Sequence, residues 1–177
     1  MKTIAILCFA LLPLSAQEIK LPANLEKLSE KAREVVDVTL DGPLLQLAAK
    51  FLSDKDPDEA RAKRLVAGLK GIYVRSFTFD NRGEYDVKDL EPMRAQLKAP
   101  GWSRIVGVRS RHDGDNAEIY LRSDADKITG LVVLAADPKE LTVVQIVGPI
   151  QPEDLRELGG RFGIPRMDLG KKGAKED

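Results

Sequence analysis

The sequence predicts one α+β domain, a mostly antiparallel sheet of about five to six strands with helices packed on one face. Three observations support this fold class. The second half of the chain holds four strand-like runs joined by short turns, which is typical of an antiparallel meander. The first half carries apolar residues at helical spacing. The chain that follows a predicted leader has about 160 residues, enough for one domain with its own core.

The first sixteen residues have the pattern of a secretory signal peptide. Lys2 supplies the positive start, an apolar run covers residues 4–12, and small residues precede Gln17. The run is too short for a membrane span, which needs about 20 apolar residues. We therefore expect cleavage near Ala16 and export to the periplasm or the extracellular space, with no transmembrane segment in the mature chain.

Composition narrows the range of partners. The full chain has 28 basic and 28 acidic residues, so no overall positive field attracts nucleic acid. The single cysteine, Cys8, lies in the leader, and Leu7 before it is not the small residue that a lipid attachment site needs. The mature chain then lacks a disulfide, a thiol nucleophile and a thiolate metal ligand.

The elements of the first half follow from spacing and capping residues. Residues 23–34 have the apolar spacing of an amphipathic helix, and residues 36–40 alternate as in a short strand, although a continuing helix is an alternative. Pro43 suits the first position of a helix that runs to residue 52. Its apolar face is made of Leu44, Leu47, Ala48 and Phe51, and Leu45 and Leu52 widen that face. We expect this face in the core, so that Leu47→Ala destabilises by roughly 2–5 kcal/mol.

The remaining elements alternate between helices and strands. Asp56 fits the N-cap of a helix that ends near Leu69. The predicted strands cover 71–80, 102–111, 117–123, 128–136 and 141–150, and the predicted helices cover 89–98 and 152–159. The runs 128–136 and 141–147 are apolar on both faces, which predicts central strands. We expect one domain over residues 17–165 and a disordered charged tail over residues 166–177.

A first acidic cluster has the beginning of a calcium loop. Asp54, Asp56 and Asp58 alternate as such loops require, but Glu59 stands where the loop needs glycine and Leu65 where it needs a bidentate glutamate. Helix capping explains the same residues.

A second acidic cluster surrounds the sole histidine. His112, Asp113, Asp115 and Asn116 flank Gly114, and these residue types are also what a hairpin turn requires. The chain lacks a G-x-S-x-G nucleophile motif, so no hydrolase triad is indicated around this histidine. We therefore predict no metal site, no cofactor and no identifiable catalytic residue.

A possible binding surface comes from arginine and tyrosine residues at alternating strand positions. Because successive side chains of a strand face opposite sides, these residues are expected to share one outward sheet face. Arginine and tyrosine lead among binding hot spots, so such a face could bind a partner, a glycan or an anionic ligand. The alternative is a solvated face with cross-strand pairs such as Arg122 with Glu118. The candidate residues are Tyr73, Arg75, Arg109, Arg111, Tyr120 and Arg122.

Four segments of the chain carry a resemblance to a known family: Leu69–Phe77 (LKGIYVRSF), Trp102–Val106 (WSRIV), Pro138–Val144 (PKELTVV) and Gly159–Pro165 (GGRFGIP). They resemble a bacterial family known as a domain of unknown function, DUF 4252. The resemblance covers nearly the whole mature chain and consists of packing and turn patterns. It implies an exported bacterial protein of unassigned function and a link to envelope signalling, and it carries over no catalytic residue.

The sequence thus predicts an exported envelope protein that acts as a non-enzymatic binding or interaction module. Its partner is an unidentified envelope protein or ligand, and its oligomeric state stays open. The alternative is a hydrolase-type enzyme with an unrecognised carboxylate site.

Overall fold

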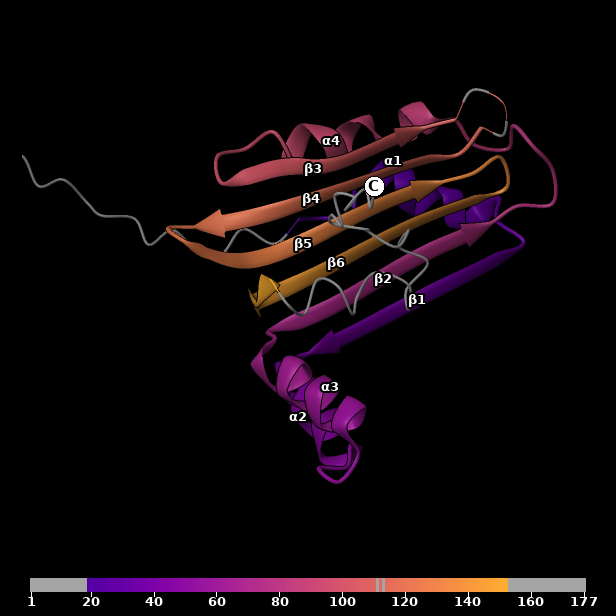
Figure 1. The fold of residues 1–177 in the computed structure, drawn as a ribbon. Coiled ribbons are helices and arrows are strands. Elements are labelled where there is room, and N and C mark those ends of the chain that lie inside the picture. The colour runs from indigo at the N-terminus through magenta and orange to yellow at the C-terminus, as the bar shows by residue number, and fades with distance from the viewer. Residues whose placement is uncertain (1–18, 111, 113, 153–177) are drawn as a thin grey trace, which may run out of the picture.

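A computed structural model describes residues 19–110, 112 and 114–152, and its centre is a six-stranded antiparallel sheet. The strand order is β1-β2-β6-β5-β4-β3 (Figure 1). The strands are β1 (Glu34–Asp41), β2 (Gly71–Thr78), β3 (Trp102–Arg109), β4 (Asn116–Asp124), β5 (Lys127–Ala136) and β6 (Glu140–Ile150). The helices are α1 (Ala23–Glu26), η1 (Lys27–Glu30), α2 (Gly42–Phe51), α3 (Pro57–Gly68), η2 (Val87–Leu90) and α4 (Glu91–Gln96). The predicted α+β class is confirmed.

The two apolar runs form the centre of the sheet, as predicted. In β5, Leu131, Val132, Val133 and Leu134 are all buried, although their side chains alternate between the two faces. β6 lies between β5 and β2 and pairs with both of them. Only strands covered on both faces can carry such continuous apolar sequence, so these two runs set the middle of the fold.

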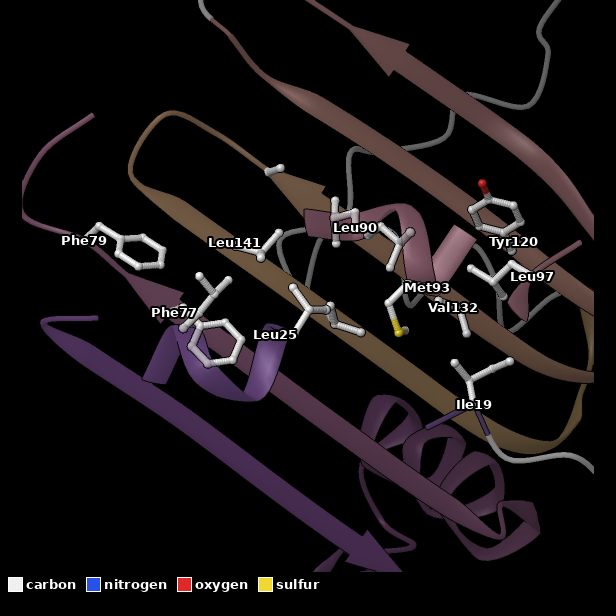
Figure 2. Packing of buried hydrophobic residues seen from close by; sticks show 14 residues of the cluster. Ile19, Leu25, Phe77, Phe79, Leu90, Met93, Leu97, Tyr120, Val132 and Leu141 are labelled. Atoms are coloured by element: carbon white, nitrogen blue, oxygen red, sulfur yellow. The ribbon is translucent and has the colours of Figure 1, made fainter. Parts of the chain in front are cut away.

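The sheet separates two apolar clusters. The first contains Phe77, Val132, Leu134, Leu141 and other strand residues together with residues of α1, η1, η2 and α4, as Figure 2 shows from close by. We call this side of the sheet face A. In Figure 1, α1 and α4 lie behind the sheet.

The opposite side, face B, carries the second cluster. Its strand residues include Val133, Val144 and Ile146, and it also contains Leu45 of α2 and Leu69, the residue that follows α3. Figure 1 shows α2 and α3 side by side at one end of the sheet. Among the described residues, the α-helices are thus divided between the two faces, with α1 and α4 on face A and α2 and α3 on face B.

Aspartate side chains cap the starts of three helices, and the sequence predicts one of these caps, Asp56. Asp41 accepts a hydrogen bond from Leu44 N–H at the start of α2, and Asp56 accepts two at the start of α3. Asp86 and Asp89 form a reciprocal capping box around η2. These side chains satisfy N–H groups that the first helical turn leaves without a partner.

Two predicted helices differ in length from the observed ones. The helix expected over 23–34 ends at Glu30, because residues from Glu34 onward pair with β2 instead. The helix expected over 89–98 begins as the 3₁₀ turn η2 and continues as α4, with Pro92 in the first turn where its missing N–H costs nothing.

The main part of the expected core face of α2 is wrong, and only Leu45, expected at the edge of that face, lies in the core. Leu45 is fully buried and Ala49 nearly so, whereas Leu47 is 50% exposed and Phe51 81% exposed. The packing of α2 against β1 and α3 turns the helix so that Leu45 enters the face B cluster. Spacing alone did not decide between two apolar stripes on one helix, because both were wide enough to bury.

Several expectations lie outside the described residues. They are the leader at 1–16, the helix expected over 152–159 beyond its first residue, and the tail at 166–177. Within the part of the chain that is described, no helix has the length and apolar character needed to cross a bilayer.

Candidate functional site

The arginine and tyrosine residues predicted to share one face do so, but that face is partly covered. Residues directly opposite in an antiparallel pair lie on the same side, and the register aligns Tyr73 with Gln145, Val132 and Tyr120 in turn. The same alternation places Arg75, Arg109 and Arg122 on face A. Face A is also the side on which α1 and α4 pack.

The coverage divides the predicted surface. Tyr120 is only 8% exposed and belongs to the face A cluster, so its ring is not displayed to a partner. The Arg75 guanidinium forms an ion pair with Asp37 at 2.9 Å across β1 and β2. Arg111 lies outside the described residues. The six side chains therefore do not make one continuous exposed patch, although a binding role for the exposed ones stays a prediction.

A buried ion-pair cluster replaces part of this surface. Glu118 on β4 is 7% exposed and accepts a hydrogen bond from Arg94 Nε on α4 at 2.8 Å. The Arg94 Nη2 atom also lies 2.6 Å from Glu118 Oε1. This contact is an ion pair without a second hydrogen bond. Tyr120 donates its hydroxyl hydrogen to Glu118 Oε2 at 2.6 Å, and Arg104 lies 3.5 Å from the same oxygen. The carboxylate thus ties α4 to the sheet.

The electrostatics of this cluster favour an ionised, fully engaged carboxylate. Burial acts to raise the pKa of Glu118, but hydrogen bonds from Arg94 and Tyr120 and the charges of Arg94 and Arg104 outweigh it and lower that pKa below 4.5. Burial and the bond to Glu118 raise the pKa of Tyr120 to about 12. A general acid needs a carboxyl whose pKa is raised, so Glu118 is suited to holding the fold together and not to proton donation.

An apolar stripe on α2 was missed as a surface feature. Leu44, Leu47 and Phe51 are 46%, 50% and 81% exposed, at helix spacings of three and four residues that place them on one face. The sequence carries the signal, since these residues have helical periodicity. Periodicity alone predicts burial, because an apolar helix face in a single domain usually meets the core.

The acidic clusters act in local structure. Asp54 pairs with Lys63 at 2.6 Å and Asp56 caps α3, which uses the carboxylates that a calcium loop would need. In the second cluster Asn116 donates to the Gly114 carbonyl, and Asp113 lies outside the described residues. No three His, Cys, Asp or Glu side chains of the described ranges are placed to hold a metal ion.

An open cleft of about 490 Å³ lies between α1, η1 and the segment before η2. Lys27 and Lys31 line one part of it, and Glu84, Asp86 and Asp89 line another, so its charge is mixed. Asp86 and Asp89 are already occupied in capping η2. The side chains that line the cleft therefore do not present one sign of charge to a ligand.

Comparison with known proteins gives one match. A family model described as a domain of unknown function (DUF4252) matches residues 29–158. No curated protein and no solved structure matches the chain. The matched range contains the whole sheet, the α2 stripe and the Glu118 cluster.

Proposed function

Since this chain belongs to the DUF4252 family, a domain of unknown function, we propose its function from its surface. It is an exported, non-enzymatic binding module of the bacterial envelope. It contacts a partner protein through the apolar stripe of α2. Export is proposed from the leader pattern of residues 1–16. The observation that carries the binding role is the exposure of Leu44, Leu47 and Phe51 on one helix face.

The stripe is unusual for a surface helix. Scattered exposed apolar residues are normal, but adjacent large ones are characteristic of interaction sites. The nearby buried residues Leu45 and Ala49 already hold α2 on the fold. The stripe is therefore available for a second contact, and its three anchors at i, i+3 and i+7 match the way one helix packs into a groove or against another helix.

Charge favours a protein over a membrane as the occupant. Helices that lie on anionic bilayers combine an apolar face with an excess of lysine and arginine. Residues 41–70, which include α2 and α3, carry six basic and five acidic side chains, so no such excess exists. The basic residues are Lys50, Lys55, Arg61, Lys63, Arg64 and Lys70, and the acidic ones are Asp41, Asp54, Asp56, Asp58 and Glu59.

The other candidate functions have less support. The arginine and tyrosine surface is interrupted by the burial of Tyr120 and by the Arg75–Asp37 pair. An enzyme with a carboxylate site needs a buried acid free to exchange protons. Glu118 is the buried carboxylate of the described chain, and Arg94 and Tyr120 hold it ionised.

Position-specific crosslinking in the native envelope tests the proposed surface. A photoreactive amino acid at position 47 or 51 is expected to trap one envelope protein, and the same probe at Arg64, an exposed position on α3, is expected to trap none. Phe51→Ser should abolish trapping at position 47. With the trapped protein purified, Leu47→Ser should weaken its affinity by at least about tenfold, since a buried leucine anchor contributes that much.

Three outcomes would overturn the binding proposal. They are equal trapping at Arg64, trapping of lipid alone, and trapping of a second copy of this chain alone. Export is tested separately by N-terminal sequencing of protein from the envelope fraction, where a start near Gln17 is expected. An intact Met1 on cytosolic protein would remove that part of the proposal.

A further inference from the structure

The segment before α1 lies on face A and is held through its backbone. Ile19 is 7% exposed, Lys20 is exposed and Leu21 is half-buried against the same apolar cluster. This alternation of buried and exposed side chains is that of an extended peptide. Figure 2 shows Ile19 within the cluster that also holds Val132 and Leu97.

Two glutamine side chains hold consecutive residues of this segment. Gln96 on α4 accepts a hydrogen bond from Lys20 N–H at 3.1 Å and donates one to the Lys20 carbonyl at 2.8 Å. Gln145 on β6 faces Ile19. In the amide orientation that satisfies both partners, Gln145 donates to the Ile19 carbonyl at 2.9 Å and accepts from Ile19 N–H at 3.0 Å.

Gln145 makes this a built site. It is only 6% exposed and lies on a central strand, where an amide without partners would cost free energy. Both of its polar atoms are satisfied by the backbone of one residue, without any contribution from that residue's side-chain chemistry. Paired amide-to-backbone bonds with pockets for alternate side chains are a general means of recognising an extended peptide.

The receptor and its occupant belong to different parts of the chain. Gln96 and Gln145 lie inside the range that the family model matches, whereas Ile19–Pro22 precedes that range. Pro22 then leads into α1, with φ −66° and ψ 147°, and separates the segment from the first helix. The segment's contacts are therefore those of a short ligand tied to the domain through Pro22.

We propose that the surface between Gln96 of α4 and Gln145 of β6 is a binding site for an extended peptide of the pattern apolar–polar–apolar–proline, and that residues 19–22 are its resident ligand. Specificity comes from the Ile19 and Leu21 side chains, and affinity from the four backbone bonds made by Gln96 and Gln145. This site is separate from the α2 stripe, so it does not depend on the function proposed above.

Supplying the ligand in trans tests the proposal. A protein that starts at Ala23 is mixed with an acetylated peptide of residues 17–22, and binding is followed by anisotropy of a labelled peptide and by the emission of Trp102, the only tryptophan. We expect saturable one-to-one binding. A peptide with Ile19→Asp should bind at least about tenfold more weakly, because it loses a buried apolar side chain.

Protein variants separate recognition from general stickiness. Gln96→Ala should weaken peptide binding by about fivefold or more, since two hydrogen bonds are lost. Gln46→Ala is the matched control. It removes a glutamine bond to the Ala67 carbonyl on the α2–α3 pair, which packs on face B and not on the face that holds Ile19, and it should leave peptide affinity unchanged.

The test remains decisive if the shortened protein does not fold alone. In that case the peptide is expected to restore the circular dichroism and cooperative melting of the full chain, and the Ile19→Asp peptide is not. No binding to a folded shortened protein would overturn the proposal, and so would failure of the peptide to restore an unfolded one. Equal effects of the two peptides would also overturn it.

Discussion

Alanine substitutions at two neighbouring positions of α2 distinguish its buried face from its exposed one. Leu45 is 0% exposed and belongs to the face B cluster, whereas Leu47 is 50% exposed. Leu45→Ala and Leu47→Ala remove the same three carbon atoms from the same helix, and helix propensity contributes equally to both. The difference between the two free energies of unfolding therefore reports burial alone.

The magnitudes follow from the exposure of each side chain. At Leu45 the three carbon atoms lose roughly 2.4 kcal/mol of transfer free energy, and the cavity adds to this, for a total of about 2–5 kcal/mol. At Leu47 about half of the transfer free energy applies and no closed cavity forms, so we expect roughly 1 kcal/mol.

Equilibrium urea unfolding of both variants is the appropriate assay. Similar m-values would show that the unfolded states are comparable, so the midpoints then give the difference directly. If Leu47→Ala costs as much as Leu45→Ala, the stripe is covered in the folded protein and the proposed contact surface does not exist. A cost below about 0.5 kcal/mol for Leu45→Ala would mean that α2 is not anchored as described.

Three further predictions concern the buried cluster and the glycines. Glu118→Gln should destabilise by roughly 1.5–3 kcal/mol near pH 7, since it weakens hydrogen bonds to a charged partner. Because folding lowers the pKa of Glu118, this contribution to stability is present above pH 4.5 and is lost as the pH falls through the folded pKa. The urea midpoints of variant and wild type should therefore converge in acid. A gap between the midpoints that is independent of pH would contradict this. Tyr120 should ionise near pH 12 instead of pH 10 in an ultraviolet titration, and Tyr120→Phe should remove that step, whereas Tyr85, whose pKa is also raised by burial, keeps its own late step. Because the folded pKa of Tyr120 is raised, its contribution to stability is present below pH 10 and is lost as the pH rises from 10 through about 12. Gly148→Ala should lower stability by at least about 1–3 kcal/mol in thermal melts, since φ is +135° and a Cβ would lie 2.8 Å from the backbone of the segment before β2. Gly68→Ala is the control, because a Cβ at this position of α3 would meet open space. It should be neutral or raise stability by up to about 1 kcal/mol.

The strands could be predicted because their signal is local. The predicted strands 128–136 and 141–150 agree with β5 and β6 within one residue at each end, and the continuous hydrophobicity of residues 128–136 and 141–147 identified both strands as central. Caps were equally local: Asp56 begins α3 because its side chain reaches N–H groups two and three residues away. Such features depend on a few neighbouring residues, so they survive without knowledge of the tertiary structure.

The candidate surfaces could be predicted only in part. Strand alternation placed Tyr73, Arg75 and Tyr120 on one face, in agreement with the register. It gave no information about which face α4 would cover, and that helix buries Tyr120 beside Glu118. Residue-type patterns show which side chains lie together, whereas exposure depends on what packs above them.

The sequence alone determined the α+β class, the antiparallel pairing, the central strands and the family resemblance. Only the tertiary structure decided which stripe of α2 is buried, which face α4 covers, and that Gln96 and Gln145 hold the backbone of Ile19 and Lys20. Gln145 is separated from Ile19 by more than 120 residues, and no local pattern encodes such a contact. Periodicity is set by the backbone of one element, but the choice among its faces is set by packing between elements that are distant in the chain.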